Sequence, residues 1–243
     1  MRVMITFSYD GTNFHGFERQ PNYRTIQEEI ENVLKYINND SNTFIVASGR
    51  TDKGVHAINQ VCHVDINVNI TEYKLKRAMN SLLPEDIHVI STKFVEDNFH
   101  ARYNVLEKVY EYKLNMGEYN PIERNYIYQL NKELDIEKIE KAIKYFIGVH
   151  DFKAFTPNKD KRENYVREVY DAFIQVNDNI VTFTFRGNGF IKYQFRNMVG
   201  LLIEIGLNRK DESCVLEILE SKNRSNHFRT SHPEGLYLKE VVY

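Results

Sequence analysis

A single carboxylate in a glycine-bounded loop is the feature of this chain that most directly suggests chemistry. Asp52 lies between Gly49 and Gly54. Arg50 precedes it by two residues and Lys53 follows it directly. Apolar runs on both sides give the pattern of strand, loop and strand, so we expect a sheet edge to hold Asp52 rigidly. Arg50 would keep the carboxylate ionised and direct it at an anionic, phosphate-bearing substrate. An ordinary polar turn is the alternative, because Gly and Asp favour turns for conformational reasons alone.

An extended run with two tyrosines and a lysine is the second candidate for function. In a strand, Lys108, Tyr110 and Tyr112 lie on one face, because side chains alternate with a period of two. Such a face could offer stacking surface and positive charge to RNA. It could equally be a half-buried strand with its tyrosine rings in the core.

One arginine interrupts a segment that is apolar nearly all round. Residues 189–206 have few polar positions, which is typical of a buried helix, yet Arg196 lies in the middle. Burying a guanidinium without an anion costs on the order of several kcal/mol. Arg196 therefore needs a carboxylate partner, or its tip reaches solvent at a cleft. Asp52 is the candidate partner and Glu204 is the rival.

The hydrophobic pattern predicts the elements that position these residues. Alternation predicts strands at 3–9, 43–48, 57–66 and 87–95, and helical spacing predicts helices at 26–38 and from about 71 to Pro84. Thr25 and Glu28 form the sequence pattern of a capping box for the first helix. The order β-α-β-β-α-β is that of the ferredoxin-like split unit.

The second half repeats this plan more loosely. Strands are expected at 108–115, 166–176, 180–186 and 236–243, and helices at 135–147, 189–206 and 212–221. We therefore expect an α+β fold of two ferredoxin-like or RRM-like halves, residues 1–98 and 99–243. Their mainly antiparallel sheets would join around a central active-site cleft.

Composition narrows the classes of function. The 243 residues carry a net charge of −2 and are 42% hydrophobic, which is ordinary for a soluble protein and lacks the global basic character of many nucleic-acid binders. Cys62 and Cys214 both lie in apolar runs, so free buried thiols are expected. No second Cys or His pair completes a metal site near Cys62. No apolar run approaches membrane-span length and no signal peptide is expected, so a cytoplasmic protein is expected.

Residues 49–57, read as G-R-T-D-K-G-V-H-A, resemble the signature G-R-T-D-x-G-V-H-A of TruA-type tRNA pseudouridine synthases. The resemblance implies that Asp52 attacks the target uridine and that Arg50 helps to displace the target base. Residues 99–112 are similar to the family's F-H-A-R…K-x-Y-x-Y, which implies that Tyr110 stacks on the target base. Residues 190–200 are similar to F-x-x-x-M-x-R-N-x-V-G, whose arginine pairs with the catalytic Asp, here Arg196.

The resemblance extends from Tyr9 to Leu238. Residues 9–17 are similar to the family's Y-D-G-T-x-F-x-G-W, and residues 233–238 to its P-x-x-G-L-x-L. It implies isomerisation of uridine to pseudouridine at tRNA positions 38 to 40, in the anticodon stem-loop, by a homodimer that needs no cofactor and no metal. Whether Asp52 acts as nucleophile or as base stays open.

Cations near these motifs are candidates for RNA contact. They are Lys53, His56, Arg19, Arg24, Arg77, Arg102 and the run 159–162. Each could instead be a solvated surface charge.

Several positions depart from the family pattern. Phe17 replaces a common Trp, Glu18 a Gln, Lys192 an aromatic residue and Gln194 a Met, and His232 stands where a small residue is typical. A catalytically inactive RNA-binding relative is therefore the alternative. A hydrolase that cleaves a nucleosidic bond is a more distant one, since it would need a second carboxylate that the Asp52 motif does not show.

Overall fold

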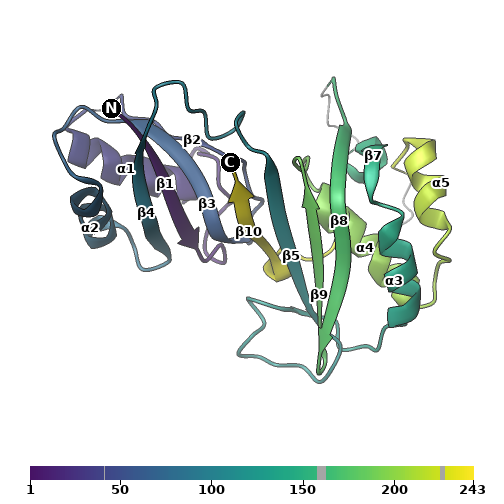
Figure 1. The fold of residues 1–243 in the computed structure, drawn as a ribbon. Helices are drawn as coiled ribbons and strands as arrows, with labels where there is room; N and C mark the ends of the chain where they lie inside the picture. The colour runs from purple at the N-terminus through teal and green to yellow at the C-terminus, as the bar shows by residue number, and fades with distance from the viewer. Residues whose placement is uncertain (41, 158–162, 225–227) are drawn as a thin grey trace. The chain divides into compact units, whose positions relative to one another are not determined.

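Two compact units divide the chain in this computed structural model, which describes residues 1–40, 42–157, 163–224 and 228–243 (Figure 1). The first unit contains residues 1–106 and 237–243, and the second contains residues 107–236. Each unit lays helices against a mainly antiparallel sheet. The expected α+β class is therefore confirmed.

The first unit has the predicted β-α-β-β-α-β order. Its elements are β1 (Arg2–Tyr9), α1 (Ile26–Asn38), β2 (Val46–Ala47), β3 (His56–Asp65), α2 (Glu72–Leu82), β4 (Ile87–Val95) and β10 (Leu236–Val242). Strands β4, β1 and β3 are antiparallel neighbours, β10 runs parallel to β3, and the short β2 pairs with β3. Alternate residues of β1, from Val3 through Ile5 to Phe7, are fully buried, which is why this sequence forms a strand with one face on the core.

Helix α1 begins where the sequence predicts, but the predicted capping box is wrong. Thr25 is the N-cap residue, yet its hydroxyl makes no capping hydrogen bond and is buried without a partner among the described residues. Instead, the amides of Ile26 and Gln27 donate to the carbonyls of Gly16 and Phe17, at 3.3 and 2.9 Å. Two of the amides that a helix leaves unsatisfied at its start thus donate to the loop that precedes the helix.

Residues 99–106 belong to the first unit, although the predicted boundary lies at 98. The amide of Ala101 donates to Nδ1 of His63 at 3.1 Å, and the hydroxyl of Tyr243 donates to the Ala101 carbonyl at 2.6 Å. The last strand also returns to this unit and pairs with β3. Because both ends of the chain belong to the first unit, no single boundary in the sequence separates the two units.

The second unit contains the remaining strands and helices. Its elements are β5 (Glu107–Asn115), β6 (Tyr128–Gln129), α3 (Ile136–Lys144), β7 (Gly148–Asp151), a 3-10 turn (Phe152–Phe155), β8 (Val166–Asn177), β9 (Ile180–Gly187), α4 (Gln194–Gly206), α5 (Cys214–Ser221) and a second 3-10 turn (Pro233–Gly235). The sheet order is β5-β9-β8-β7, antiparallel throughout, with β6 parallel to β5. Figure 1 shows α3 and α5 beside β8 and β7.

Helix α4 begins at Gln194, whereas the pattern predicts a start at residue 189. Gly189 and Tyr193 have positive φ angles of 152° and 62°, which a right-handed helix cannot contain. The buried Gln194 amide closes this entry, because its Oε1 accepts from the Ile191 amide at 2.9 Å. The departure at Gln194 therefore has a local structural role.

The buried His63 generates a prediction about pH. Burial lowers its pKa to about 4, and the nearby Arg2 and His100 add to the effect. An unfolded histidine titrates near about 6.5, so the unfolded chain binds one more proton between these two values. We expect the free energy of unfolding to fall as pH drops from about 6.5 toward 4. His63→Gln, followed by urea unfolding over this range, should flatten that dependence.

The exposed His88 on β4 provides the control. His88→Gln should leave the pH dependence of the wild type in place. An unchanged slope in His63→Gln would contradict the assigned cause.

Candidate active site

The loop that carries Asp52 is held through its backbone. The Phe17 amide donates to the Thr51 carbonyl at 3.1 Å, and the Val55 amide donates to the Asp52 carbonyl at 3.2 Å. The first bond ties the loop to the segment before α1, and the second closes the loop on itself. Asp52 itself is half-buried. Its backbone is therefore positioned independently of any ligand.

A side-chain network lies under the same loop. Gln60 on β3 donates through Nε2 to the Gly49 carbonyl at 3.2 Å and accepts through Oε1 from Ser48 Oγ at 2.7 Å. The Tyr9 hydroxyl lies 2.8 Å from Thr51 Oγ1. Burial raises the pKa of Tyr9 to about 12, so this hydroxyl keeps its proton at neutral pH. Tyr9 opens the motif 9–17, which was the available signal for it, whereas no pattern in the sequence points to Gln60 as a support of the loop.

Two glycines of the motif 9–17 allow the close approach of these segments. A Cβ on Gly11 would lie 2.0 Å from the Val55 carbonyl oxygen. Gly16 has a φ of 95°, and a Cβ there would lie 3.1 Å from the Thr51 carbonyl oxygen. Side chains at these positions would push the motif 9–17 off the Asp52 loop.

Arg50 forms an ion pair with Glu18. The sequence did not predict this pair. Arg50 Nη2 lies 2.7 Å from Glu18 Oε1, and the two side chains are 66% and 50% exposed. The departure at Glu18 thus supplies the carboxylate that holds this guanidinium. The expected role of Arg50, keeping Asp52 ionised, stays a prediction.

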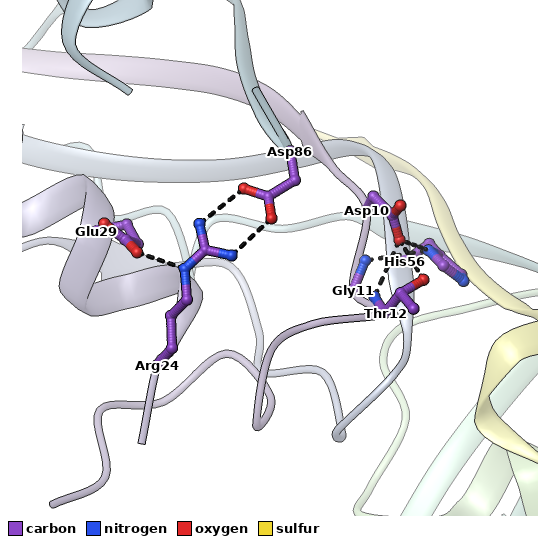
Figure 2. Close-up of polar contacts among 7 residues, drawn as sticks. All are labelled: Asp10, Gly11, Thr12, Arg24, Glu29, His56 and Asp86. Carbon is purple, nitrogen blue, oxygen red and sulfur yellow. Dashed lines mark hydrogen bonds and ion pairs between the residues drawn. The ribbon is translucent and has the colours of Figure 1, made fainter. Parts of the chain in front are cut away.

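His56 is buried at the start of β3, with only 2% of its surface exposed. Figure 2 shows its ring beside Asp10, Gly11 and Thr12. The Gly11 amide lies 3.1 Å from His56 Nδ1, and Asp10 Oδ1 lies 3.2 Å from it. The ring also stacks on Tyr237. This burial favours a structural role for His56 over the expected RNA contact.

Arg24 is similarly engaged (Figure 2). Its two terminal nitrogens donate to the Asp86 carboxylate at 2.6 and 2.9 Å, and Nε donates to Glu29 at 2.6 Å. Its guanidinium also lies over the Phe14 ring. The hydrogen bond to Asp86 is the main cause of its raised pKa. Arg24 thus ties the start of α1 to the turn before β4, which favours a structural role over RNA contact.

Four of the other candidate cations, Arg19 among them, are exposed. Lys53, Arg77 and Arg102 all lie on the surface of the first unit, and the last two lie near the rings of Tyr73 and Tyr103. Arg19 donates to the buried Glu31 carboxylate at 2.9 Å. The run 159–162 lies outside the described residues.

Tyr110 and Tyr112 share a face of β5, but their environments differ. Tyr112 is fully buried and donates its hydroxyl to the His232 carbonyl at 2.9 Å, so it is a core residue. Tyr110 is 8% exposed, with its ring against Phe190 and Phe195 at centroid distances of 5.2 and 5.6 Å. Of the two tyrosines, Tyr110 stays the candidate for contact with a base.

Arg196 is half-buried on α4 and is fixed at its Nε, which donates to the Ser231 carbonyl at 2.8 Å. The Ser231 amide donates back to the Arg196 carbonyl at 3.0 Å. The rival partner Glu204 accepts from Arg209 at 3.2 Å. Asp52 belongs to the other unit, so its pairing with Arg196 stays a prediction.

Asn197 is a structural residue that the sequence analysis did not single out. Its side chain is fully buried, donates to the Phe155 carbonyl at 2.6 Å and accepts from Thr230 Oγ1 at 2.7 Å. It therefore holds the segment before β10 against α4. Its place directly after Arg196 in the family motif was the available signal.

The described residues contain no group of three His, Cys, Asp or Glu side chains that could hold a metal ion. In the same residues, no helix is long and apolar enough to cross a membrane. Cys62 is buried, which raises the pKa of its thiol.

Comparisons with known proteins agree with the motifs. A family model described as tRNA pseudouridine synthase matches residues 5–104 and 142–243. A protein named tRNA pseudouridine synthase A from Streptococcus agalactiae serotype III (strain NEM316) is 43% identical over 245 residues, covering all of this chain and 95% of the relative. A protein of the same name from Streptococcus pneumoniae (strain 70585) is 44% identical, covering all of this chain and 98% of the relative.

Similarity to solved structures is much weaker. A chain in the crystal structure of a Cbf5-Nop10-Gar1 complex aligns with a TM-score of 0.34 and 15% identity, over 82% of this chain and 54% of that chain. That likeness is too distant to bear on function. The family match, by contrast, covers the Asp52 loop and α4, and the full-length relatives also cover β5. By these matches this chain belongs to the tRNA pseudouridine synthase family.

Proposed function

We propose that this protein isomerises uridine to pseudouridine in tRNA, with Asp52 as the catalytic residue and positions 38 to 40 of the anticodon stem-loop as its targets. The observation that carries the proposal is the Asp52 loop, whose family signature is complete and whose backbone is anchored to the motif 9–17. Catalysis benefits when a reacting group is held in place before substrate arrives.

The reaction needs little beyond a positioned carboxylate. The N1–C1′ bond of the nucleotide breaks, the uracil turns, and C5 joins C1′ while its proton is lost and N1 gains one. Substrate and product have the same composition, so no electron or group comes from outside. Asp52 can act as nucleophile or as base toward the ribose.

Tyr110 and Arg196 complete the proposal, on the strength of their motif positions. Removing the target base from its stack costs on the order of a few kcal/mol, and an aromatic ring can replace part of that stacking. We assign this role to Tyr110, whose ring is steadied by Phe190 and Phe195. We assign to Arg196 the pairing that keeps Asp52 ionised.

The departures from the family pattern do not remove these residues. Glu18 pairs with Arg50, and Gln194 closes the entry to α4. Lys192 is exposed, with its ammonium 5.4 Å from the Tyr193 ring centroid. We further propose that the enzyme is a cytoplasmic homodimer with tRNA across both subunits, as the family resemblance implies.

Pseudouridine mapping tests the proposed reaction. Purified protein is incubated with unmodified tRNA transcript, without added metal or cofactor, and pseudouridine is located nucleotide by nucleotide. With the wild-type protein, we expect pseudouridine in the anticodon stem-loop of the tRNA. Asp52→Asn should abolish turnover while changing tRNA affinity by less than about twofold, because only the charge of one carboxylate is lost.

Asp65→Asn is the matched control, since Asp65 is an exposed carboxylate at the far end of β3. It should keep wild-type activity. Near-normal turnover by Asp52→Asn would refute the assignment of Asp52. Tight tRNA binding by the wild type without product would favour the inactive relative, and release of free uracil would favour the hydrolase.

A charge-coupling experiment tests the pairing of Arg196 with Asp52. Arg196→Met should lower activity by about 100-fold or more and destabilise the protein by about 1–3 kcal/mol, because a carboxylate is left unpaired. Part of that loss reflects the hydrogen bond to Ser231. In the Asp52→Asn background the loss of stability should therefore shrink by about 1 kcal/mol.

Arg209→Met is the control, because Arg209 is ion-paired with Glu204, a carboxylate on the same helix, but is half exposed. Its effect should be the same in both backgrounds. Equal destabilisation by Arg196→Met with and without Asp52 would rule out the pairing.

A further inference from the structure

A stacked pair of aromatic rings lies in the loop before α1. His15 and Tyr23 have centroids 4.0 Å apart and planes inclined by 24°. Tyr23 is 49% exposed, although one of its faces is covered by His15. A large part of its ring surface is therefore open to solvent.

The loop holds this pair in a defined position. The His15 amide donates to the Arg24 carbonyl at 3.0 Å, and the Tyr23 amide donates to the Gln20 carbonyl at 3.3 Å. The Gln20 side chain donates to the His15 carbonyl at 2.7 Å. The rings are thus presented by a closed turn, which reduces the conformational entropy lost when a ligand stacks on them.

The pair borders the Asp52 loop. A Cβ on Gly16, the residue after His15, would lie 3.3 Å from the Lys53 amide nitrogen and 3.4 Å from the Asp52 carbonyl carbon. The Lys53 ammonium lies 3.3 Å from His15 Nε2, within hydrogen-bond distance. An open aromatic face and an exposed ammonium are therefore found together, directly beside the proposed catalytic residue.

A second exposed His–Tyr stack does not share this setting. His100 and Tyr103 stack with centroids 4.2 Å apart, but they lie beside His63. His63 is near the end of β3 that is remote from the Asp52 loop. Proximity to Asp52 thus singles out the pair of His15 and Tyr23.

We propose that His15, Tyr23 and Lys53 form a nucleotide subsite, which stacks the base next to the target uridine and places Lys53 at a backbone phosphate. The proposal rests on the proposed function. When the target nucleotide leaves its stack, its neighbour exposes a base face that the Tyr23 ring can cover. Stacking accepts any base, because every base has a π-face. Such a subsite would hold the RNA without reading its sequence, as modification of several neighbouring positions requires.

Binding to a tRNA transcript that carries 2-aminopurine next to the target uridine tests the subsite. The measurement uses the Asp52→Asn background, so that binding is separated from turnover. We expect stacking to quench the fluorescence. Tyr23→Ala should abolish most of the quenching and weaken binding by about 10-fold, the scale of one base–aromatic stack. Tyr23→Phe keeps the ring and should bind within about twofold of its parent.

Tyr36→Ala is the matched control, because Tyr36 is also a tyrosine of the first unit, on α1, and is 77% exposed. It should leave both quenching and affinity unchanged. In the enzyme that retains Asp52, Tyr23→Ala should raise KM and leave kcat unchanged.

The subsite is wrong if Tyr23→Ala binds and quenches as its parent does, or if Tyr23→Phe loses as much as Tyr23→Ala. These results would leave the proposed function intact, provided that the wild type forms pseudouridine. If the wild type forms none and Tyr23-dependent quenching persists, the reaction is wrong and the base-stacking subsite stands.

Discussion

The backbone contact between the motif 9–17 and the Asp52 loop is the constraint on which the candidate site depends. A carboxylate on a loop is useful for catalysis only if the loop has one conformation. Here Phe17 donates to the loop, and Gly11 and Gly16 remove the side chains that would keep the two segments apart. The first amides of α1 donate to the same motif, so the helix, the motif and the Asp52 loop form one hydrogen-bonded assembly.

Charge is distributed in the first unit so that many cations already have anionic partners. Arg24 and Arg19 serve the fold through Asp86 and Glu31, and Arg50 lies against Glu18. In a chain with a net charge of −2, this leaves local rather than global attraction for RNA. Exposed cations near the Asp52 loop and stacking on aromatic rings are then the interactions by which such a surface could bind RNA.

Much of the fold could be predicted from sequence, because its signals are local. Alternation along the strands and helical spacing along the helices of the first unit predicted its β-α-β-β-α-β order. What failed depends on hydrogen bonds and backbone angles that the hydrophobic pattern does not encode. Thr25 lacks its expected cap because Gly16 and Phe17 bind the first amides of α1. The start of α4 moved to Gln194 because two residues before it have positive φ.

In the candidate site, too, local motifs could be read from the sequence, whereas tertiary contacts could not. The motif made Asp52 the candidate catalytic residue, which stays a prediction. The burial of His56 and the pairing of Arg24 with Asp86 follow from residues far away in sequence. The return of β10 to the first unit could likewise not be seen in a pattern of neighbouring residues.

Amide hydrogen exchange of the unliganded protein tests the central claim most directly, which is that the Asp52 loop is fixed before substrate binds. The account predicts that the amides of Phe17 and Val55 exchange almost as slowly as those in the middle of β1, since opening them requires disruption of the unit. Exchange as fast as that of Asn42, an amide in an exposed turn, would contradict it. The loop would then be ordered only by its substrate.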